Sequence, residues 1–216
     1  MAYFPFFADL DGRKGLIVGG GTVALRKVQK ILPYGPQLTV VAPDIRAEIA
    51  AIPGLRLLRE AFSEQLLDAR DWCFVIAASD DRDVNRQIAA LCKTRKIPVN
   101  AVDDRAACSF LFPALVRRGS LSVGISTGGA SPSGAVYVKE QLDALLPDNL
   151  GEILSWLDAR RETVKTEIPS ETRRSACFVR LFAACLGVGG PLSEAKFRKI
   201  LVEFRAESLD LEGQYE

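Results

Sequence analysis

The stretch GLIVGGGTVA, residues 15–24, decides the fold class of this chain. Its first four residues are apolar and predict a short buried strand, and the helical spacing of apolar residues begins after the glycines. Gly19, Gly21 and Ala24 fit the pattern G-x-G-x-x-A. In that pattern the first glycine permits a tight turn, the second lets a pyrophosphate approach the backbone, and the third small residue lets the helix pack closely on the strand.

A helix that opens directly after such a turn points its first amides at bound phosphate groups. We therefore expect Gly19, Gly21, Thr22 and Val23 to bind a dinucleotide, because the pattern lies between a predicted strand and a predicted helix. The alternative is a simple turn without a ligand.

The same alternation of strand and helix continues through the first half of the chain. It predicts an α/β fold with a Rossmann-like, doubly wound parallel sheet over residues 1–113. The expected strands cover residues 15–18, 37–42, 55–59, 72–78 and 97–102, and the expected helices cover residues 22–32, 44–51, 63–67 and 81–94.

The pattern changes in the second half of the chain. Two predicted strands, residues 110–116 and 120–125, form either a hairpin or additions to another sheet. A loop of small residues, STGGASPSG, then opens onto a helix at about residues 135–146, and the rest of the chain has helical spacing. We expect a linking segment over residues 114–147 and a helical C-terminal domain over residues 148–216.

The composition excludes several classes of mechanism. The chain contains no histidine, so it can form no Ser-His-Asp triad, no Cys-His dyad and no His-ligated zinc site. Its 28 Lys and Arg residues nearly balance its 27 Asp and Glu residues, which gives no global signature of nucleic-acid binding. No apolar run approaches the length of a membrane span, and no secretory signal is recognised. The five cysteines include no CxxC pair and fit a reduced compartment. We therefore expect a cytoplasmic protein that binds neither nucleic acid nor a membrane.

An acidic residue follows the second predicted strand. Asp44 lies 23 residues after Gly21, directly after LTVVAP. With Pro43 beside it, a carboxylate there would accept a hydrogen bond from a ribose hydroxyl and repel a 2′-phosphate, which favours NAD over NADP. The alternative is that Asp44 caps a helix from Ile45 onward, and the sequence does not separate the two.

The fourth predicted strand ends in small residues. Ala78 and Ser79 leave room for a cofactor at the carboxyl edge of the sheet, where the ligands of open parallel sheets bind. We expect Asp80 to cap the helix that starts at Asp81 rather than to contact a ligand.

Four ordered blocks of sequence carry a family resemblance. They are FPFFADLDGRKGLIVGGGTVALRKVQKIL (4–32), FVIAASDDRDVNRQI (74–88), VNAVDDRAACSFLFPALVRRGSL (99–121) and VGISTGGASPSGAVYVKEQLDALLP (123–147). In this order and spacing they resemble the precorrin-2 dehydrogenase / sirohydrochlorin ferrochelatase family, which includes the N-terminal module of the sirohaem synthases. The match covers residues 4 to about 150 well and the helical tail only loosely.

The resemblance implies an enzyme that uses NAD to oxidise precorrin-2 to sirohydrochlorin in sirohaem biosynthesis. In some members it also implies insertion of a metal ion into the macrocycle. The candidate metal substrates are Fe²⁺ and Co²⁺. It further implies a homodimer with the segment 114–147 at its interface. We expect no methyltransferase domain of the fused synthases within these 216 residues, and no residue is assigned as a ligand of a resident metal.

In the family pattern an aspartate at the position of Asp103 is the catalytic acid–base group. Asp103 ends the fifth predicted strand and so lies at the same carboxyl edge as the glycine turn. The alternative is that Asp103 caps the turn that follows. Cys108, close by in the sequence, is expected to be a buried thiol rather than a metal ligand.

The small-residue loop offers hydroxyls and amides to an anionic group. We expect Ser126, Thr127, Gly128 and Ser131 to bind a carboxylate of the substrate, and Ser131 also to cap the helix that follows. Precorrin-2 carries many carboxylates, so its site needs basic side chains. The candidates are Arg117, Arg118, Lys139, Arg160, Arg161, Arg173 and Arg174.

Two alternative functions stay open. The chain could be a regulatory Rossmann domain that senses NAD without catalysis, or a dehydrogenase of an unrelated small substrate. The absence of histidine counts against the many dehydrogenases that use histidine as their acid–base group.

Overall fold

The computed structural model describes residues 4–206 of the chain. The chain divides into two compact units, Met1–Phe112 and Pro113–Glu216.

The first unit is built on a five-stranded parallel sheet. Its strands lie in the order β3-β2-β1-β4-β5, which is the order of a doubly wound fold whose first strand is central. Every pair of neighbours is parallel. The strands are β1 (Lys14–Val18), β2 (Gln37–Val41), β3 (Arg56–Leu58), β4 (Phe74–Ala77) and β5 (Val99–Ala101).

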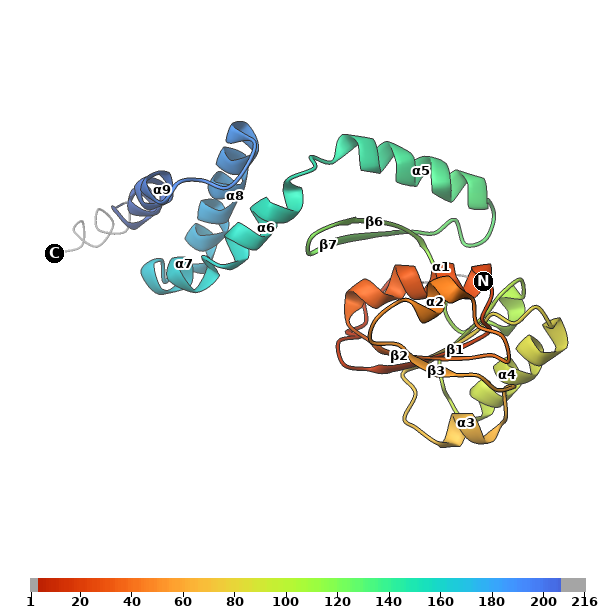
Figure 1. Ribbon diagram of the computed structural model, residues 1–216. Helices are drawn as coiled ribbons and strands as arrows, with labels where there is room; N and C mark the ends of the chain where they lie inside the picture. Colours follow the sequence, from red (N-terminus) through yellow and green to blue (C-terminus); the bar gives the residue numbers. More distant parts are fainter. Residues whose placement is uncertain (1–3, 207–216) are drawn as a thin grey trace. The chain divides into compact units, whose positions relative to one another are not determined.

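Helices cover both faces of this sheet, with α1 and α2 on one side and α3 and α4 on the other (Figure 1). The β1 and β4 strands are apolar almost throughout because side chains of both faces are buried. The Rossmann-like α/β sheet predicted from the sequence is therefore confirmed. The helical elements are α1 (Thr22–Ile31), η1 (Leu32–Tyr34), α2 (Ala47–Ala50), α3 (Gln65–Asp68), α4 (Arg82–Thr94) and η2 (Arg105–Ala107).

The strand predicted at residues 110–116 is wrong in its first half. Phe110 and Phe112 belong to no strand, and they pack with Phe74 on the face of the sheet that α1 covers. The strand starts only at Ala114. A run of apolar residues predicts burial, and here burial comes from packing of a chain segment on the sheet, not from strand pairing.

The second unit begins with an antiparallel hairpin, β6 (Ala114–Arg118) and β7 (Leu121–Ile125), which forms a two-stranded sheet of its own. This decides between the two arrangements left open by the sequence. Gly119 in its turn has φ +58°, and a Cβ there would lie 2.8 Å from the Cα of Gly151. The turn therefore packs backbone against backbone on the helix that contains Gly151.

Helices make up the rest of the second unit, as expected for the C-terminal part. They are α5 (Pro132–Leu145), α6 (Leu150–Asp158), α7 (Arg161–Glu167), α8 (Glu171–Val188) and α9 (Glu194–Ala206). A third apolar core joins α6 to α9, and its centre includes Leu181 and Phe197. The hairpin and α5 contact each other outside that core.

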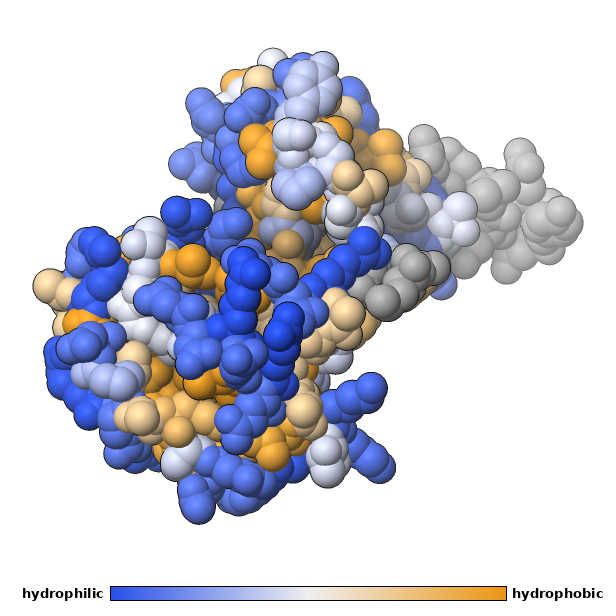
Figure 2. Space-filling view, turned by 90° about the vertical axis from the view of Figure 1, so that its right-hand side faces the viewer, coloured by the Kyte–Doolittle hydropathy of each residue, from blue (hydrophilic) through white to orange (hydrophobic). Residues whose placement is uncertain are grey.

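Hydrophilic side chains cover most of the face shown in Figure 2, with smaller hydrophobic patches between them. Several exposed apolar side chains lie on α5, among them Val136, Tyr137 and Leu145. Within residues 4–206, no helix is long and apolar enough to cross a membrane.

Candidate active site

The turn from β1 into α1 has the backbone that the glycine pattern predicts. Gly19 has φ +124°, a conformation that favours glycine, and its amide donates to the carbonyl of Val41 over 2.9 Å. A Cβ on Gly19 would overlap the carbonyl oxygen of Ala78. This glycine is therefore required by the protein itself, since the turn runs in direct contact with the end of β4.

Gly21 is a different case. It is the N-cap of α1 with φ −87°, and an added Cβ would meet nothing closer than the Asp80 Oδ1, at 3.9 Å. Protein packing therefore does not explain a glycine at this position. No side chain among the described residues caps the start of α1, so the amides at Thr22 and Val23 are not occupied by a cap. An uncapped helix start behind a glycine that leaves open space fits a dinucleotide pyrophosphate.

At the end of β2, Asp44 lies at the carboxyl edge of the sheet, and its role in binding a ribose stays a prediction. Pro43 and Asp44 are both exposed, just past the last strand residue. The alternative role of Asp44 as a helix cap is wrong, because α2 starts at Ala47 and its N-cap is Arg46. The chain between Asp44 and Ala47 is held by the glycine turn instead, since the Arg46 amide donates to the carbonyl of Gly20 over 3.1 Å.

Arg46 is a residue that the sequence analysis missed. Its Nη1 donates to the Thr22 Oγ1 over 3.3 Å, and its Nη2 pairs with the Glu48 Oε1 at 2.5 Å. A guanidinium group therefore lies beside the first residue of α1, close in the chain to Asp44. The signal was an arginine two residues after the acidic position, a place from which arginine can reach a nucleotide phosphate.

At the end of β4, Ala78 is buried and Ser79 half-buried. The Asn85 side chain, in a residue that is 2% exposed, forms hydrogen bonds with both the amide and the carbonyl of Ser79. Its Oδ1 accepts from the Ser79 amide over 3.0 Å and its Nδ2 donates to the Ser79 carbonyl over 2.8 Å. Asn85 was also missed, although a polar residue on the apolar face of a helix was its signal. The expectation that Asp80 caps this helix is wrong, because Asp81 is the cap and accepts from two amides of the first turn.

At the end of β5, Asp103 is exposed and has φ +59°, which is rare for any residue but glycine, asparagine and aspartate. The turn that follows is capped by Asp104, whose carboxylate accepts from the Ala107 amide over 3.2 Å. The alternative that Asp103 is this cap is therefore wrong. Among the described residues its carboxylate has no hydrogen bond or ion pair, so it is available to a ligand.

The side chain of Cys108 contacts the backbone of β5. Its sulfur lies 3.2 Å from both the amide and the carbonyl oxygen of Ala101. Burial raises the pKa of this thiol, which favours the protonated form and disfavours metal binding. Within residues 4–206, no group of three or more cysteines and carboxylates is placed to hold a metal ion.

The small-residue loop belongs to the second unit. The Thr127 hydroxyl donates to the Ser131 carbonyl over 2.9 Å, and the Ser131 Oγ accepts from the Gly134 amide over 2.9 Å. The cap at Ser131 is therefore as expected. Gly128 has φ +61° and its amide lies 3.2 Å from the Ser126 Oγ. The role of these residues in binding a substrate carboxylate stays a prediction.

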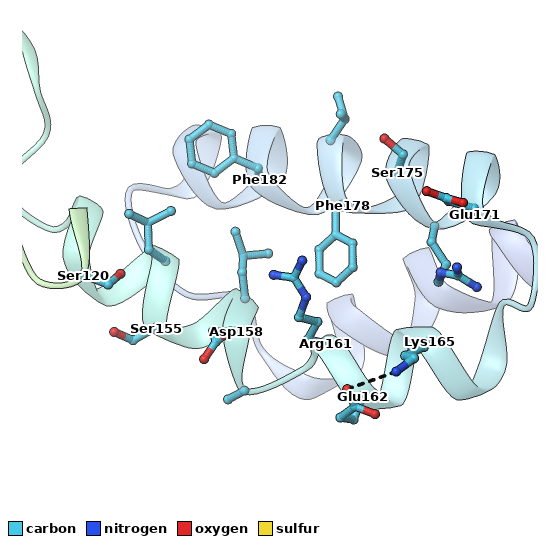
Figure 3. Close-up of a pocket in the computed structure, with 15 residues that line it drawn as sticks. Ser120, Ser155, Asp158, Arg161, Glu162, Lys165, Glu171, Ser175, Phe178 and Phe182 are labelled. Atoms are coloured by element: carbon cyan, nitrogen blue, oxygen red, sulfur yellow. Dashed lines mark ion pairs between the residues drawn. The ribbon is translucent and has the colours of Figure 1, made fainter. Parts of the chain in front are cut away.

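The basic candidates of the second unit divide by their contacts. Arg118 pairs with Asp143 at 2.9 Å, and Arg160 stacks over the Trp156 ring, so both support the unit itself. Arg161 and Arg174 instead line a groove between α6, α7 and α8. Phe178 and Phe182 also line it. In Figure 3, Phe178 points from α8 toward Arg161, and Lys165 pairs with Glu162 at the edge of the groove. The lining carries both signs of charge, so it indicates no class of ligand.

Comparison with known proteins decides the family of the first unit. Residues 6–114 match the protein family described as "Putative NAD(P)-binding". The chain belongs to this NAD(P)-binding family. The geometry of the glycine turn, with its open helix start, agrees with that membership.

The NAD(P)-binding chain is also similar to larger curated proteins. It is 38% identical to "Siroheme synthase" of Neisseria meningitidis serogroup C and 38% identical to "Siroheme synthase" of Mannheimia succiniciproducens, in each case over 84% of this chain. It spans only 38% of the length of each of these relatives.

A solved structure matches over most of the chain. It is described as "SirC, precorrin-2 dehydrogenase", with a TM-score of 0.68 and 29% identity, and the match covers 94% of this chain and 100% of that one. The resemblance stated from the four sequence blocks is thus confirmed.

Proposed function

We propose that this chain oxidises precorrin-2 to sirohydrochlorin with NAD as the electron acceptor. The observation that carries the proposal is the carboxyl edge of the sheet, where an open dinucleotide turn and the unpaired carboxylate of Asp103 follow strands of one sheet. The similarity to a precorrin-2 dehydrogenase over 94% of the chain supports this choice of substrate.

The residues that would hold NAD are those of the three strand ends. The amides at Thr22 and Val23 would bind the pyrophosphate across Gly19 and Gly21, as the open helix start allows. The Asp44 carboxylate would accept hydrogen bonds from the adenosine ribose, with Pro43 beside it. Ala78 and Ser79 would line the cofactor at the end of β4. Bound NAD supplies the hydride acceptor.

Asp103 would act as the proton acceptor. Oxidation of precorrin-2 removes a hydride and a proton, and the carboxylate of Asp103 can accept the proton because it is exposed and unpaired. The residue is held in the left-handed region, which costs on the order of 1 kcal/mol or more and is common where a site fixes a side chain. For metal insertion, the further step that the resemblance implies, the same carboxylate would accept the two pyrrole protons one after the other and release each to water as Fe²⁺ or Co²⁺ enters.

Substrate binding and assembly complete the proposal. The loop with Ser126, Thr127, Gly128 and Ser131 would bind a carboxylate of the macrocycle through its amides and hydroxyls. The exposed apolar side chains of α5, with the hairpin that α5 contacts, would form the interface of a homodimer over the segment 114–147. The five cysteines, all unpaired in the structure, support a cytoplasmic location.

The decisive experiment incubates the protein with precorrin-2 and NAD under nitrogen and follows the spectrum of sirohydrochlorin and the absorbance of NADH. We expect one NADH for each precorrin-2 consumed, because the conversion removes two electrons. NADH binding without any conversion would favour the NAD-sensing alternative. A separate assay of purified sirohydrochlorin with Fe²⁺ or Co²⁺, against a control without protein, tests metal insertion.

A further inference from the structure

Three charged residues follow one another in the chain where the adenosine ribose is expected. Asp44, Arg46 and Glu48 lie in the five-residue stretch 44–48 that follows β2, and all three are exposed. Two residues after Asp44 the chain contacts the glycine turn, where the Arg46 amide donates a hydrogen bond to the Gly20 carbonyl. The cluster is therefore fixed to the nucleotide turn by the backbone.

The guanidinium of Arg46 has both of its terminal nitrogens engaged. Nη1 donates to the Thr22 Oγ1 at 3.3 Å, and Nη2 is held by the Glu48 Oε1 at 2.5 Å. The contact holds the pKa of Glu48 below its usual range and raises that of Arg46, so both groups are charged at neutral pH. The arginine is thus positioned at the start of α1 but neutralised by its partner.

We propose that the Arg46–Glu48 ion pair sets the cofactor preference of this site, by withholding from NADP an arginine that is already in position to bind its 2′-phosphate. The inference rests on the proposed function, since it assumes that the turn binds a dinucleotide. It goes beyond the ribose-binding role proposed for Asp44, because it makes Glu48 the residue that decides between NAD and NADP.

The charge balance gives the reason. An arginine near the end of the second strand is the group that accommodates a 2′-phosphate in sites of this type. Here Asp44 and Glu48 outweigh Arg46, which leaves a net charge of −1 from one positive and two negative groups. A 2′-phosphate carries up to two negative charges and would be repelled, whereas the neutral 2′-hydroxyl of NAD is indifferent to this charge.

The substitution Glu48→Gln tests the proposal. It keeps the shape of the side chain, removes the charge and leaves the guanidinium free to turn toward a phosphate. We expect the affinity for NADPH to rise about fivefold to tenfold, because one repulsive charge is lost near a dianion. The affinity for NADH should stay within about twofold. Both are measured by fluorescence titration of the wild-type chain and the variant.

Two further variants test whether the gain requires Arg46 and whether it is local to these residues. In the double variant Arg46→Gln with Glu48→Gln, the gain in NADPH affinity should disappear. Glu64→Gln is the matched control, because Glu64 is an exposed glutamate that also pairs with an arginine, Arg95, at 2.7 Å, but lies just before α3, on the other face of the sheet. It should leave both affinities unchanged.

Each outcome has one meaning. If wild-type protein fails to bind NADH, the proposed function is wrong and the ion pair has no ligand to select. If NADH binds and Glu48→Gln does not strengthen NADPH binding, the inference about the ion pair is wrong and the proposed function stands. The inference is also overturned if the double variant keeps the gain, or if wild-type protein already binds NADPH as tightly as NADH.

Discussion

The Lys27 Nζ donates to the Asn100 Oδ1 across 3.2 Å, which joins α1 to β5 inside the first unit. The ammonium also lies 3.8 Å from the centre of the Phe112 ring. No ion pair between described residues gives it a carboxylate partner. Burial, together with the positive charge of Lys30, lowers the pKa of Lys27 to about 8, while Cys108 acts in the opposite direction. The lysine is therefore a half-buried charge held by neutral groups.

Replacement of Lys27 by methionine should change the free energy of unfolding by an amount that depends on pH. The pKa in the folded protein, about 8, lies below the ordinary value of 10.5, so between these pH values the unfolded chain binds more protons. The free energy of unfolding of the wild-type protein, measured relative to Lys27→Met, should rise as the pH increases from about 8 to 10.5. Urea titrations at several pH values measure it.

The exposed Lys93 provides the control for this experiment, because it lies on the outer side of α4. The difference between wild type and Lys93→Met should not change over the same pH range. If the difference in free energy of unfolding between wild type and Lys27→Met stays constant or falls over this pH range, the pKa of Lys27 is not lowered in the folded protein.

The two outer glycines of the nucleotide turn should respond differently to alanine. Gly21→Ala places a methyl group in open space at an ordinary φ, so the melting temperature should stay near that of the wild type. The affinity for NADH should fall at least tenfold, because the methyl group occupies the path of the pyrophosphate. Gly19→Ala should instead destabilise the fold by about 1–3 kcal/mol, since it combines positive φ with an overlap on Ala78. If Gly21→Ala binds NADH normally, this turn does not hold the pyrophosphate.

Asn85 should matter for both stability and cofactor binding. Asn85→Ala leaves the amide and the carbonyl of Ser79 without their partners in a half-buried place. Since an unsatisfied buried group costs about 1–3 kcal/mol, we expect a loss of about 2–4 kcal/mol in the free energy of unfolding. The affinity for NADH should also decrease, because the end of β4 is no longer fixed. Gln87→Ala, on the exposed side of the same helix, should change neither quantity; equal effects of the two variants would refute the role of Asn85.

Much of the fold could be predicted because its signals are local. Apolar runs that end in glycine or small residues predict β1, β2 and β4, shorter apolar stretches predict β3 and β5, and the spacing G-x-G-x-x-A predicts the turn between β1 and α1. The helix cap at Ser131 followed from a serine before a proline. In each case the residues that decide the structure are neighbours in the chain.

The rest depends on contacts between distant residues. Arg46 and Asn85 act through Thr22, Gly20 and Ser79, and no spacing rule joins these positions before the sheet exists. Phe110 was assigned to a strand because its apolar surroundings look the same whether a segment pairs or packs. The positive φ of Asp103 was likewise hidden, since it arises from the geometry of the chain leaving β5.

The substitution Asp103→Asn gives the most direct test of the central claim, that this chain oxidises precorrin-2 with NAD and uses Asp103 for the protons. Asparagine keeps the size of the side chain and tolerates the left-handed backbone, so folding should not change. Rates of NADH and sirohydrochlorin formation are compared under nitrogen, together with NADH affinity. We predict turnover by the wild-type protein, a rate at least a hundredfold lower for Asp103→Asn, and NADH affinities within about threefold. A variant that turns over precorrin-2 at the wild-type rate, or wild-type protein that binds NADH and leaves precorrin-2 unchanged, would contradict the account.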